Sequence, residues 1–318
     1  MISADDLSKD EVNEIFEIAD NLKEGKEELT LREHSVISLF FQYPSVRTRS
    51  AFEAAAAQLG SSSIYISGNM AELESGELPS DIAKALSGYC DFIVARMLKH
   101  QDLAKMAEGA SVPLINGMTD LEHPTQALSD LYTIRMYKGN LKNVKLAFMG
   151  DITSNVANSL MLFGSRLGME IALVGPKEMI PNSIYFNKSR EYGTLDTFAS
   201  LDEGLEDADI VYTDTFSGMG KSNPDEARLK SLSQYRLTKE AMQKADSEAL
   251  VMHCLPVHRG VVLPFFRTQK TESFKNNVPV FLFYGILHLF RVDFIRYVRT
   301  AITKINSRLH NTPLFIKF

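Results

Sequence analysis

The sequence has no tryptophan, only two cysteines and no long apolar run. The two cysteines, Cys90 and Cys254, cannot form the disulfide framework of a small secreted protein, and no signal-peptide pattern opens the chain, so we expect a cytoplasmic location. The apolar run at residues 278–290 is shorter than the roughly 18 residues that a membrane-spanning helix needs, so we expect no membrane partner. The net charge of −6 argues against nonspecific binding to nucleic acid, and a small anionic ligand would need a local basic site.

Segments with strand-like and helix-like patterns alternate along most of the 318 residues, and a chain of this length is close to the size at which domains divide. The alternation favours parallel sheets flanked by helices. We therefore predict an α/β protein with two domains, one over residues 1–138 and one over residues 139–260, with a long helix after Pro124 as the bridge. The expected strands are 35–41, 63–66, 92–95, 112–115, 144–149, 170–174, 194–198, 210–213 and 249–253. The expected helices are 8–26, 50–59, 81–89, 103–110, 125–138, 155–167, 201–205 and 238–245.

A basic, hydroxyl-rich stretch follows the first expected strand. Residues 41–53 read FQYPSVRTRSAFE and join that strand to an alanine-rich helix. A strand that enters a helix through Ser45, Val46, Arg47 and Thr48 offers backbone N–H groups, the positive end of a helix dipole, hydroxyl donors and a guanidinium group. These are the donors that bind phosphate. The alternative is an ordinary solvated helix start, and the glycine-rich P-loop pattern is missing.

Three further polar residues lie where parallel sheets bind ligands. Arg96 closes the apolar run 92–95 at the carboxyl end of an expected strand, with a surface arginine as the alternative. His123 directly precedes Pro124, and proline is well suited to the first helical turn, so His123 and Gln126 should lie at a helix N-terminus. A structural histidine with satisfied hydrogen bonds is the alternative for His123.

Two other stretches suggest chemistry that their patterns do not support. Gly150 and Asp151 follow an apolar strand, but a single glycine does not meet the Gly-x-Gly-x-x-Gly fingerprint, so a dehydrogenase is disfavoured. Cys254 beside His253 suggests a cysteine nucleophile or a zinc site, yet neighbours in an extended segment point to opposite faces. We therefore expect no metal site.

Taken in order along the chain, these motifs resemble the aspartate/ornithine carbamoyltransferase family, which transfers a carbamoyl group from carbamoyl phosphate to an amine. The ornithine branch is the more similar one, because the loop lysine of the aspartate branch aligns with Ser75. The resemblance covers about residues 1–260. The matching motifs are Ser45-Val46-Arg47-Thr48-Arg49, Arg96, His123-Pro124-Thr125-Gln126, Asp214 to Gly220, and Met252-His253-Cys254-Leu255-Pro256 with His258-Arg259-Gly260.

The resemblance implies a role for each matching residue, a homotrimer, a cis Leu255-Pro256 peptide and no cofactor. The phosphate of carbamoyl phosphate would contact Ser45, Arg47, Thr48 and the backbone of Val46. The carbamoyl end would contact Gln126, Arg96 and His123, and the last two would polarise the carbonyl group. L-ornithine would contact Asn155, Asp214, Met219, Cys254 and Leu255. For Asn155, a helix cap is an equally compatible interpretation.

The sequence departs from the family pattern at two places. Phe216 replaces a tryptophan and Gly218 replaces a substrate-contacting serine, so putrescine or an N-acylated ornithine is an alternative acceptor. Residues 261–318 lack the family's C-terminal motif, including an arginine of the carbamoyl phosphate site. They hold nine Lys and Arg against two Asp and Glu, a balance of +7, which leaves 25 minus 38, or −13, for residues 1–260. Three explanations of this tail are open: a reading-frame shift, a genuine divergence, or an added basic element. A reading-frame shift could leave an inactive relative.

Overall fold

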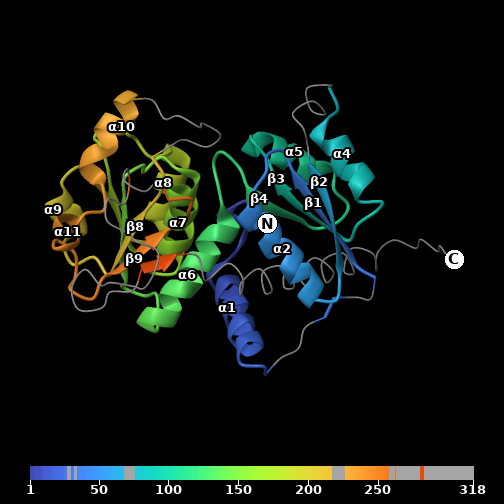
Figure 1. Ribbon diagram of the computed structural model, residues 1–318, viewed down its shortest axis with the longest axis horizontal. Helices are drawn as coiled ribbons and strands as arrows, with labels where there is room; N and C mark the ends of the chain where they lie inside the picture. The colour runs from blue at the N-terminus through green and yellow to red at the C-terminus, as the bar shows by residue number, and fades with distance from the viewer. Residues whose placement is uncertain are drawn as a thin grey trace. The chain divides into compact units, whose positions relative to one another are not determined.

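The computed structural model describes residues 1–26, 30–31, 34–67, 76–216, 226–257, 262 and 280–282. The described residues form two compact units. The first unit contains Met1–Ile2 and Asp10–Met118, and the second contains Ser3–Lys9 and the described part of Thr119–Ile286. Each unit is a parallel sheet with helices packed on it (Figure 1), so the predicted α/β class is confirmed.

The first unit is built around four parallel strands. These strands are β1 (Val36–Phe41), β2 (Ser62–Ser67), β3 (Phe92–Arg96) and β4 (Leu114–Met118), and they lie in the order β2-β1-β3-β4. The helices are α1 (Lys9–Lys23), α2 (Val46–Gln58), α4 (Pro79–Leu86) and α5 (His100–Gly109). Apolar residues of α4 and α5 pack on one face of the sheet, against Phe40, Ile93 and Ala95. All of β3 is buried, which explains why this strand reads as a continuous apolar run.

The second unit is built around six parallel strands in the order β10-β9-β8-β5-β6-β7. The strands are β5 (Lys145–Met149), β6 (Glu170–Val174), β7 (Leu195–Phe198), β8 (Ile210–Thr213), β9 (Leu250–His253) and β10 (Val280–Leu282). The helices are α6 (Pro124–Lys138), α7 (Asn155–Arg166), α8 (Ser183–Tyr192), α9 (Leu201–Leu205), α10 (Glu226–Leu232) and α11 (Lys239–Met242), with the 3-10 turn η2 (Ser233–Tyr235). Figure 1 shows this unit in green to orange.

Helix α2 begins at Val46, four residues before the predicted start at Ser50. The earlier start follows from Ser45, whose side chain accepts the N–H of Thr48 and caps the helix. The Ser-x-Arg-Thr-Arg motif is therefore the first turn of the helix and not a loop before it. Helices α8 and α10 were not predicted.

Both sheets reverse their winding direction at one point, and parallel sheets bind ligands at such points. In the first unit the reversal lies between β1 and β3, where Phe41 pairs with Arg96. In the second unit it lies between β5 and β8, where Met149 pairs with Thr213. The predicted site residues that follow these strands are thus at the expected edge of each sheet.

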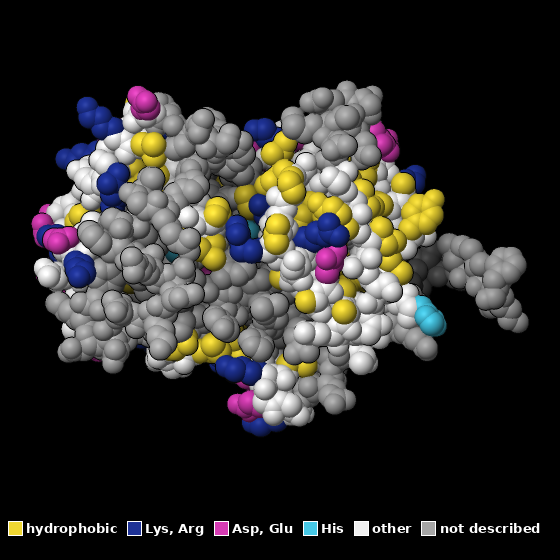
Figure 2. Space-filling view, viewed as in Figure 1, with side chains coloured by type: hydrophobic (Ala, Val, Ile, Leu, Met, Phe, Trp, Pro, Cys, Tyr) yellow, Lys and Arg dark blue, Asp and Glu magenta, His cyan; other side chains and the backbone are white. Residues whose placement is uncertain are grey.

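The described surface carries mixed charge and some large exposed apolar side chains. On the face drawn in Figure 2, the described Lys and Arg side chains are interspersed with acidic and apolar ones. Val46, Tyr89 and Ile180 are among the exposed apolar residues. Of the helices that the structure describes, none is long and apolar enough to cross a membrane.

Candidate active site

The first turn of α2 contains the predicted phosphate-binding residues. Ser45 Oγ accepts the Thr48 N–H at 3.3 Å and donates to Thr48 Oγ1 at 3.1 Å. The first N–H groups of a helix have no acceptor within the helix and lie at the positive end of its dipole. Val46, in the same turn, is 82% exposed, whereas Thr48 is buried. The turn therefore presents anion-binding donors next to a buried hydroxyl group.

Arg96 is buried at the end of β3 and bonds to this turn. Its Nη1 donates to Thr48 Oγ1 at 3.3 Å, and its guanidinium lies 4.5 Å from the centroid of the Tyr43 ring. Arg96 is only 9% exposed, so the surface-arginine alternative is wrong. Burial lowers the pKa of this guanidinium, and the positive charge of Arg47 lowers it further. Within the described part of the chain, Arg96 Nε is buried without a hydrogen-bond partner. A buried positive charge is stabilised when an anion binds beside it, so Arg96 is well placed to bind one.

The second arginine of the motif, Arg49, has a carboxylate partner on the same helix. Arg49 Nε donates to Glu53 Oε1 at 2.9 Å, one helical turn later. The Arg49 guanidinium also lies 3.8 Å from the centroid of the Tyr65 ring. Because a carboxylate already neutralises Arg49, it provides a matched comparison for Arg47.

His123 and Gln126 open helix α6 in the second unit. His123 is the N-cap residue and Pro124 is the first residue of the helix, as predicted. The His123 N–H donates to Ser159 Oγ at 3.0 Å, and its Nδ1 lies 3.4 Å from Thr125 Oγ1. Both His123 and Gln126 are buried. An imidazole in this position can donate a hydrogen bond to a carbonyl oxygen from its other ring nitrogen.

The amide of Gln126 is held by an acid one turn further along α6. Gln126 Nε2 donates to Asp130 Oδ1 at 2.9 Å, and the Tyr212 hydroxyl donates to Asp130 Oδ2 at 2.7 Å. Burial raises the pKa of Asp130 to about 7, and the charge of Asp214 adds to this effect, while the two hydrogen bonds oppose it. Sequence reasoning missed Asp130, although its spacing of four residues from Gln126 on a helix was a usable signal.

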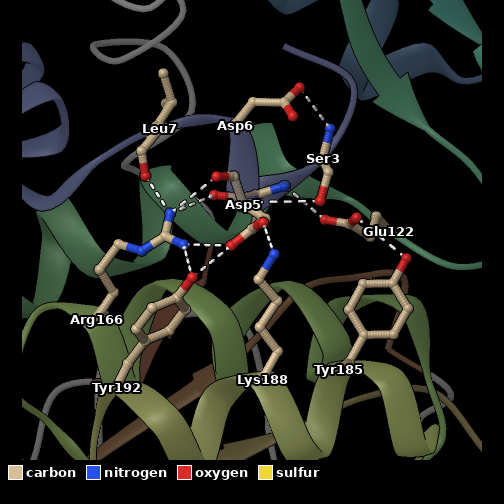
Figure 3. A network of polar contacts seen from close by, with 10 residues as sticks. Ser3, Asp5, Asp6, Leu7, Glu122, Arg166, Tyr185, Lys188 and Tyr192 are labelled. Carbon is tan, nitrogen blue, oxygen red and sulfur yellow. Dashed lines mark hydrogen bonds and ion pairs between the residues drawn. The ribbon is translucent and has the colours of Figure 1, made fainter.

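A buried carboxyl group anchors the loop before His123 (Figure 3). Glu122 accepts the Ala4 N–H at 2.7 Å and the Tyr185 hydroxyl at 3.1 Å. Ser159, which accepts the His123 N–H, lies 3.4 Å from Glu122 Oε2. Burial raises the pKa of Glu122 to about 7 against the effect of its hydrogen bonds. The N-terminal segment, this loop and His123 thus share one connected set of hydrogen bonds.

A charged cluster holds the 3-10 turn η1 (Ala4–Asp6) on the second unit (Figure 3). Asp5 pairs with Arg166 and Lys188 and accepts the Tyr192 hydroxyl at 2.9 Å. Although burial opposes the change, these hydrogen bonds lower the pKa of Asp5. The partners are 161 to 187 residues away from Asp5 in the sequence, and no local pattern signals the cluster.

Asp214 and Cys254 meet where the neighbouring strands β8 and β9 end. The Cys254 thiol donates to Asp214 Oδ1 at 2.7 Å, and the Thr215 N–H donates to the same oxygen at 2.6 Å. Burial raises the pKa of Asp214, while the hydrogen bonds from Cys254 and Thr215 act to lower it. A nearby ammonium group would favour the ionised form of this buried carboxyl group.

The structure argues against a nucleophilic or zinc-binding role for Cys254. Burial, followed by the charge of Asp214, raises the pKa of the Cys254 thiol well above its usual value, which disfavours the thiolate. His253 Nδ1 accepts the Leu255 N–H at 2.8 Å. Among the described residues, no three His, Cys, Asp or Glu side chains are grouped so that they could hold a metal ion.

Asn155 is the first residue of α7 and not its cap. Ser154 caps the helix by accepting the Ala157 N–H at 3.2 Å, so the helix-cap interpretation of Asn155 is wrong. Asn155 Nδ2 donates instead to the Thr119 carbonyl oxygen at 2.6 Å. This bond ties the start of α7 to the loop that leads to His123.

The other predicted acceptor-site residues are only partly described. Leu255 has a φ of 54° and precedes a cis peptide bond to Pro256, as the family resemblance implied. Met219 lies outside the described residues. Phe216, which replaces the family's tryptophan, is buried against Gly150: a Cβ atom on that glycine would lie 2.8 Å from Phe216 Cε1.

The comparisons with known proteins agree with this architecture. The model described as "Aspartate/ornithine carbamoyltransferase, carbamoyl-P binding domain" matches residues 1–136, and the model described as "Aspartate/ornithine carbamoyltransferase, Asp/Orn binding domain" matches residues 142–278. A protein from Hyperthermus butylicus named ornithine carbamoyltransferase is 39% identical over 269 residues, which are 82% of this chain and 86% of that protein. A protein of the same name from Archaeoglobus fulgidus is 36% identical over 264 residues, with the same two coverages.

A solved structure gives the same result. The ornithine carbamoyltransferase from Pyrococcus furiosus superposes with a TM-score of 0.80 and 30% identity, over 95% of each chain. With the two matching domain models, this shows that the chain belongs to the aspartate/ornithine carbamoyltransferase family, a family of carbamoyl-transferring enzymes. The resemblance drawn from the sequence motifs is therefore confirmed.

Proposed function

We propose that the protein is an ornithine carbamoyltransferase, which converts carbamoyl phosphate and L-ornithine into L-citrulline and phosphate. The observation that carries this proposal is the bonded set of Arg96, Thr48 and Ser45 at the start of α2, with the Arg47 charge nearby. That set supplies a guanidinium, hydroxyl groups and helix N–H groups, which are suitable donors for a phosphate group. The names of the relatives from Hyperthermus butylicus and Archaeoglobus fulgidus support ornithine as the acceptor.

In the proposed reaction the donor is bound at both of its ends. The phosphate accepts hydrogen bonds from Ser45, Arg47, Thr48 and the Val46 N–H, while Arg96, His123 and Gln126 bind the carbamoyl group. The ornithine amine attacks the carbonyl carbon, a new C–N bond forms and a tetrahedral oxyanion develops. Arg96 and His123 stabilise this oxyanion, and each such donor contributes about 3 kcal/mol to the transition state in enzymes of known mechanism. The C–O bond to phosphate then breaks, its electron pair leaves with the phosphate, and the proton that the amine nitrogen loses goes to the departing phosphate.

The acceptor site is proposed at the edge of the second sheet. Asp214 faces an ammonium group of ornithine. This role is supported because the Asp214 carboxyl group is buried and accepts a hydrogen bond from the Cys254 thiol. We assign the other ornithine contacts to Asn155, Met219, Cys254 and Leu255. Because Gly218 replaces the serine of the ornithine pattern, putrescine or an N-acylated ornithine is the second candidate acceptor.

A colorimetric assay for ureido products tests this function directly. The purified protein is incubated with carbamoyl phosphate and separately with L-ornithine, putrescine, N-acetylornithine and L-aspartate. We expect product with L-ornithine. Product with another amine alone would overturn the acceptor assignment, and no product with any amine would overturn the enzyme assignment and favour a noncatalytic relative.

The two arginines of the motif provide a matched pair of variants. Arg47→Ala should lower kcat/KM for carbamoyl phosphate by at least about tenfold, since a lost charge-assisted contact exceeds about 1.4 kcal/mol. Arg49→Ala removes the same group two residues away, where Glu53 already neutralises it, and should have a much smaller effect. Equal effects of the two substitutions would contradict the phosphate-site assignment.

We also propose the functional division and the assembly. Residues 1–138 would bind carbamoyl phosphate and residues 139–260 would bind the amino acid, in a cytoplasmic homotrimer as in the family. Residues 261–318 would form a divergent segment, of which almost all lies outside the described residues. Size-exclusion chromatography with light scattering tests the trimer.

A further inference from the structure

Gln126 can present either of two atoms to a ligand, and its environment selects one of them. A glutamine amide has a donating NH2 group and an accepting oxygen, and rotation of the amide by half a turn exchanges them. Gln126 is buried, with Nε2 donating to Asp130 Oδ1 at 2.9 Å. The accepting atom, Oε1, is thereby left for another partner.

The preference arises from the chemistry of the carboxyl group. An ionised carboxylate only accepts hydrogen bonds, so it pairs with the NH2 group of the amide and disfavours the rotated form. Asp130 is itself fixed from the opposite side by the Tyr212 hydroxyl, which donates to its other oxygen at 2.7 Å. Tyr212 is fully buried and stacks on Phe148 with ring centroids 5.3 Å apart, so this donor is held in place.

From this arrangement we propose that Asp130 is a positioning residue, which orients the Gln126 amide so that its Oε1 accepts the carbamoyl N–H of the donor substrate. The inference rests on the proposed function, in which Gln126 binds the carbamoyl end of carbamoyl phosphate. It also explains a selectivity: because Oε1 accepts a hydrogen bond, a substrate with an NH2 group should bind more tightly than one with a methyl group at the same position.

Two stable analogues isolate this contact. Phosphonoacetamide carries a phosphonate, a carbonyl and an NH2 group, and acetonylphosphonate replaces the NH2 group with a methyl group. The ratio of their dissociation constants, measured by isothermal titration calorimetry, reports the hydrogen bond to the NH2 group. In the wild-type protein we expect phosphonoacetamide to bind about fivefold more tightly, the size of one net hydrogen bond.

Asp130→Asn should reduce this ratio to near one. Because the Tyr212 hydroxyl donates to position 130, the introduced amide would turn its oxygen to Tyr212 and its NH2 group to Gln126. The Gln126 amide would then rotate and present an NH2 group to the ligand. The double variant Asp130→Asn/Tyr212→Phe lacks the Tyr212 hydroxyl that fixes the introduced amide. In this variant the ratio of the two dissociation constants should therefore rise part of the way back to its wild-type value. A purely structural role of Asp130 would predict no such recovery.

Thr133→Val is the matched control. Thr133 is buried on the same helix, but its hydroxyl bonds only to the Ser129 carbonyl oxygen among the described contacts, so the ratio should stay at its wild-type value. An unchanged ratio in Asp130→Asn would overturn the inference and leave the proposed function standing. A wild-type protein that binds neither analogue would overturn the proposed function, and the inference with it.

A second measurement applies if Asp130→Asn does not fold. Neutron diffraction from wild-type crystals with phosphonoacetamide locates the hydrogen atoms of the Gln126 amide. We expect Oε1 to face the ligand NH2 group. If Nε2 faces it instead, the inference is wrong.

Discussion

Replacing Glu122 with glutamine should change the way in which stability depends on pH. The Glu122 carboxyl group is fully buried, and burial raises its pKa from 4.5 to about 7. The folded protein therefore holds this proton to a higher pH than the unfolded chain does. The stabilisation that results is complete below about pH 4.5 and is lost as the pH rises through about 7.

The magnitude follows from the two pKa values. The difference between about 7 and 4.5, at about 1.4 kcal/mol for each pH unit, is about 3 kcal/mol. Glutamine is neutral at every pH and keeps an oxygen for the Ala4 N–H and an NH2 group for the Tyr185 oxygen. Near pH 5 the variant and the wild type should have similar stability, and near pH 9 the variant should be more stable by up to about 3 kcal/mol.

Urea unfolding at a series of pH values, followed by circular dichroism at fixed protein concentration, measures this difference. The other buried acids, such as Asp130, affect both proteins equally and cancel in the comparison. Glu17→Gln, at an exposed position of α1, controls for the loss of one negative charge. Parallel stability curves for the wild type and Glu122→Gln between about pH 5 and pH 9 would refute the reasoning from burial.

Two further predictions concern the edge of the second sheet. Gly150→Ala should lower the free energy of unfolding by about 2 kcal/mol, because φ is +117° and the added Cβ would lie 2.8 Å from the Phe216 ring. Gly139→Ala, at a φ of +80° with open space around it, should lower the free energy of unfolding by less, as measured by urea unfolding of both variants. Asp214→Asn should raise KM for L-ornithine by at least about tenfold and leave KM for carbamoyl phosphate nearly unchanged, as measured by the ureido assay.

The parts of this structure that the sequence predicts are those set by local pattern. Apolar runs such as residues 92–95 and 210–213 are strands, because parallel strands are buried on both faces. His123 lies at the N-cap position of α6 because Pro124 fits the first helical turn. The start of α2 was misplaced because the expected helix followed the alanine-rich run, whereas the helix begins where Ser45 satisfies its first N–H groups.

The parts that the sequence does not predict depend on contacts between distant residues. Glu122 bonds to Ala4, which is 118 residues away, and Asp130 bonds to Tyr212, which is 82 residues away. A buried acid looks the same in sequence as an exposed one, so its raised pKa becomes evident only from the packing around it. The spacing of Gln126 and Asp130 is visible in the sequence. The Tyr212 hydroxyl that fixes the other oxygen of Asp130 is not.

The buried charges of the two units differ in sign, and each sign is opposite to that of the ligand proposed for it. In the first unit Arg96 is buried with the Arg47 charge nearby, so a phosphate dianion would relieve both desolvation and repulsion. In the second unit burial raises the pKa values of Asp130 and Asp214, so an ammonium group would favour their ionised forms. An ionised Asp130 can only accept hydrogen bonds, so it holds the NH2 group of Gln126 more firmly than the neutral acid does. Binding of the amine near Asp214 should therefore strengthen the proposed orientation of the Gln126 amide toward the carbamoyl group.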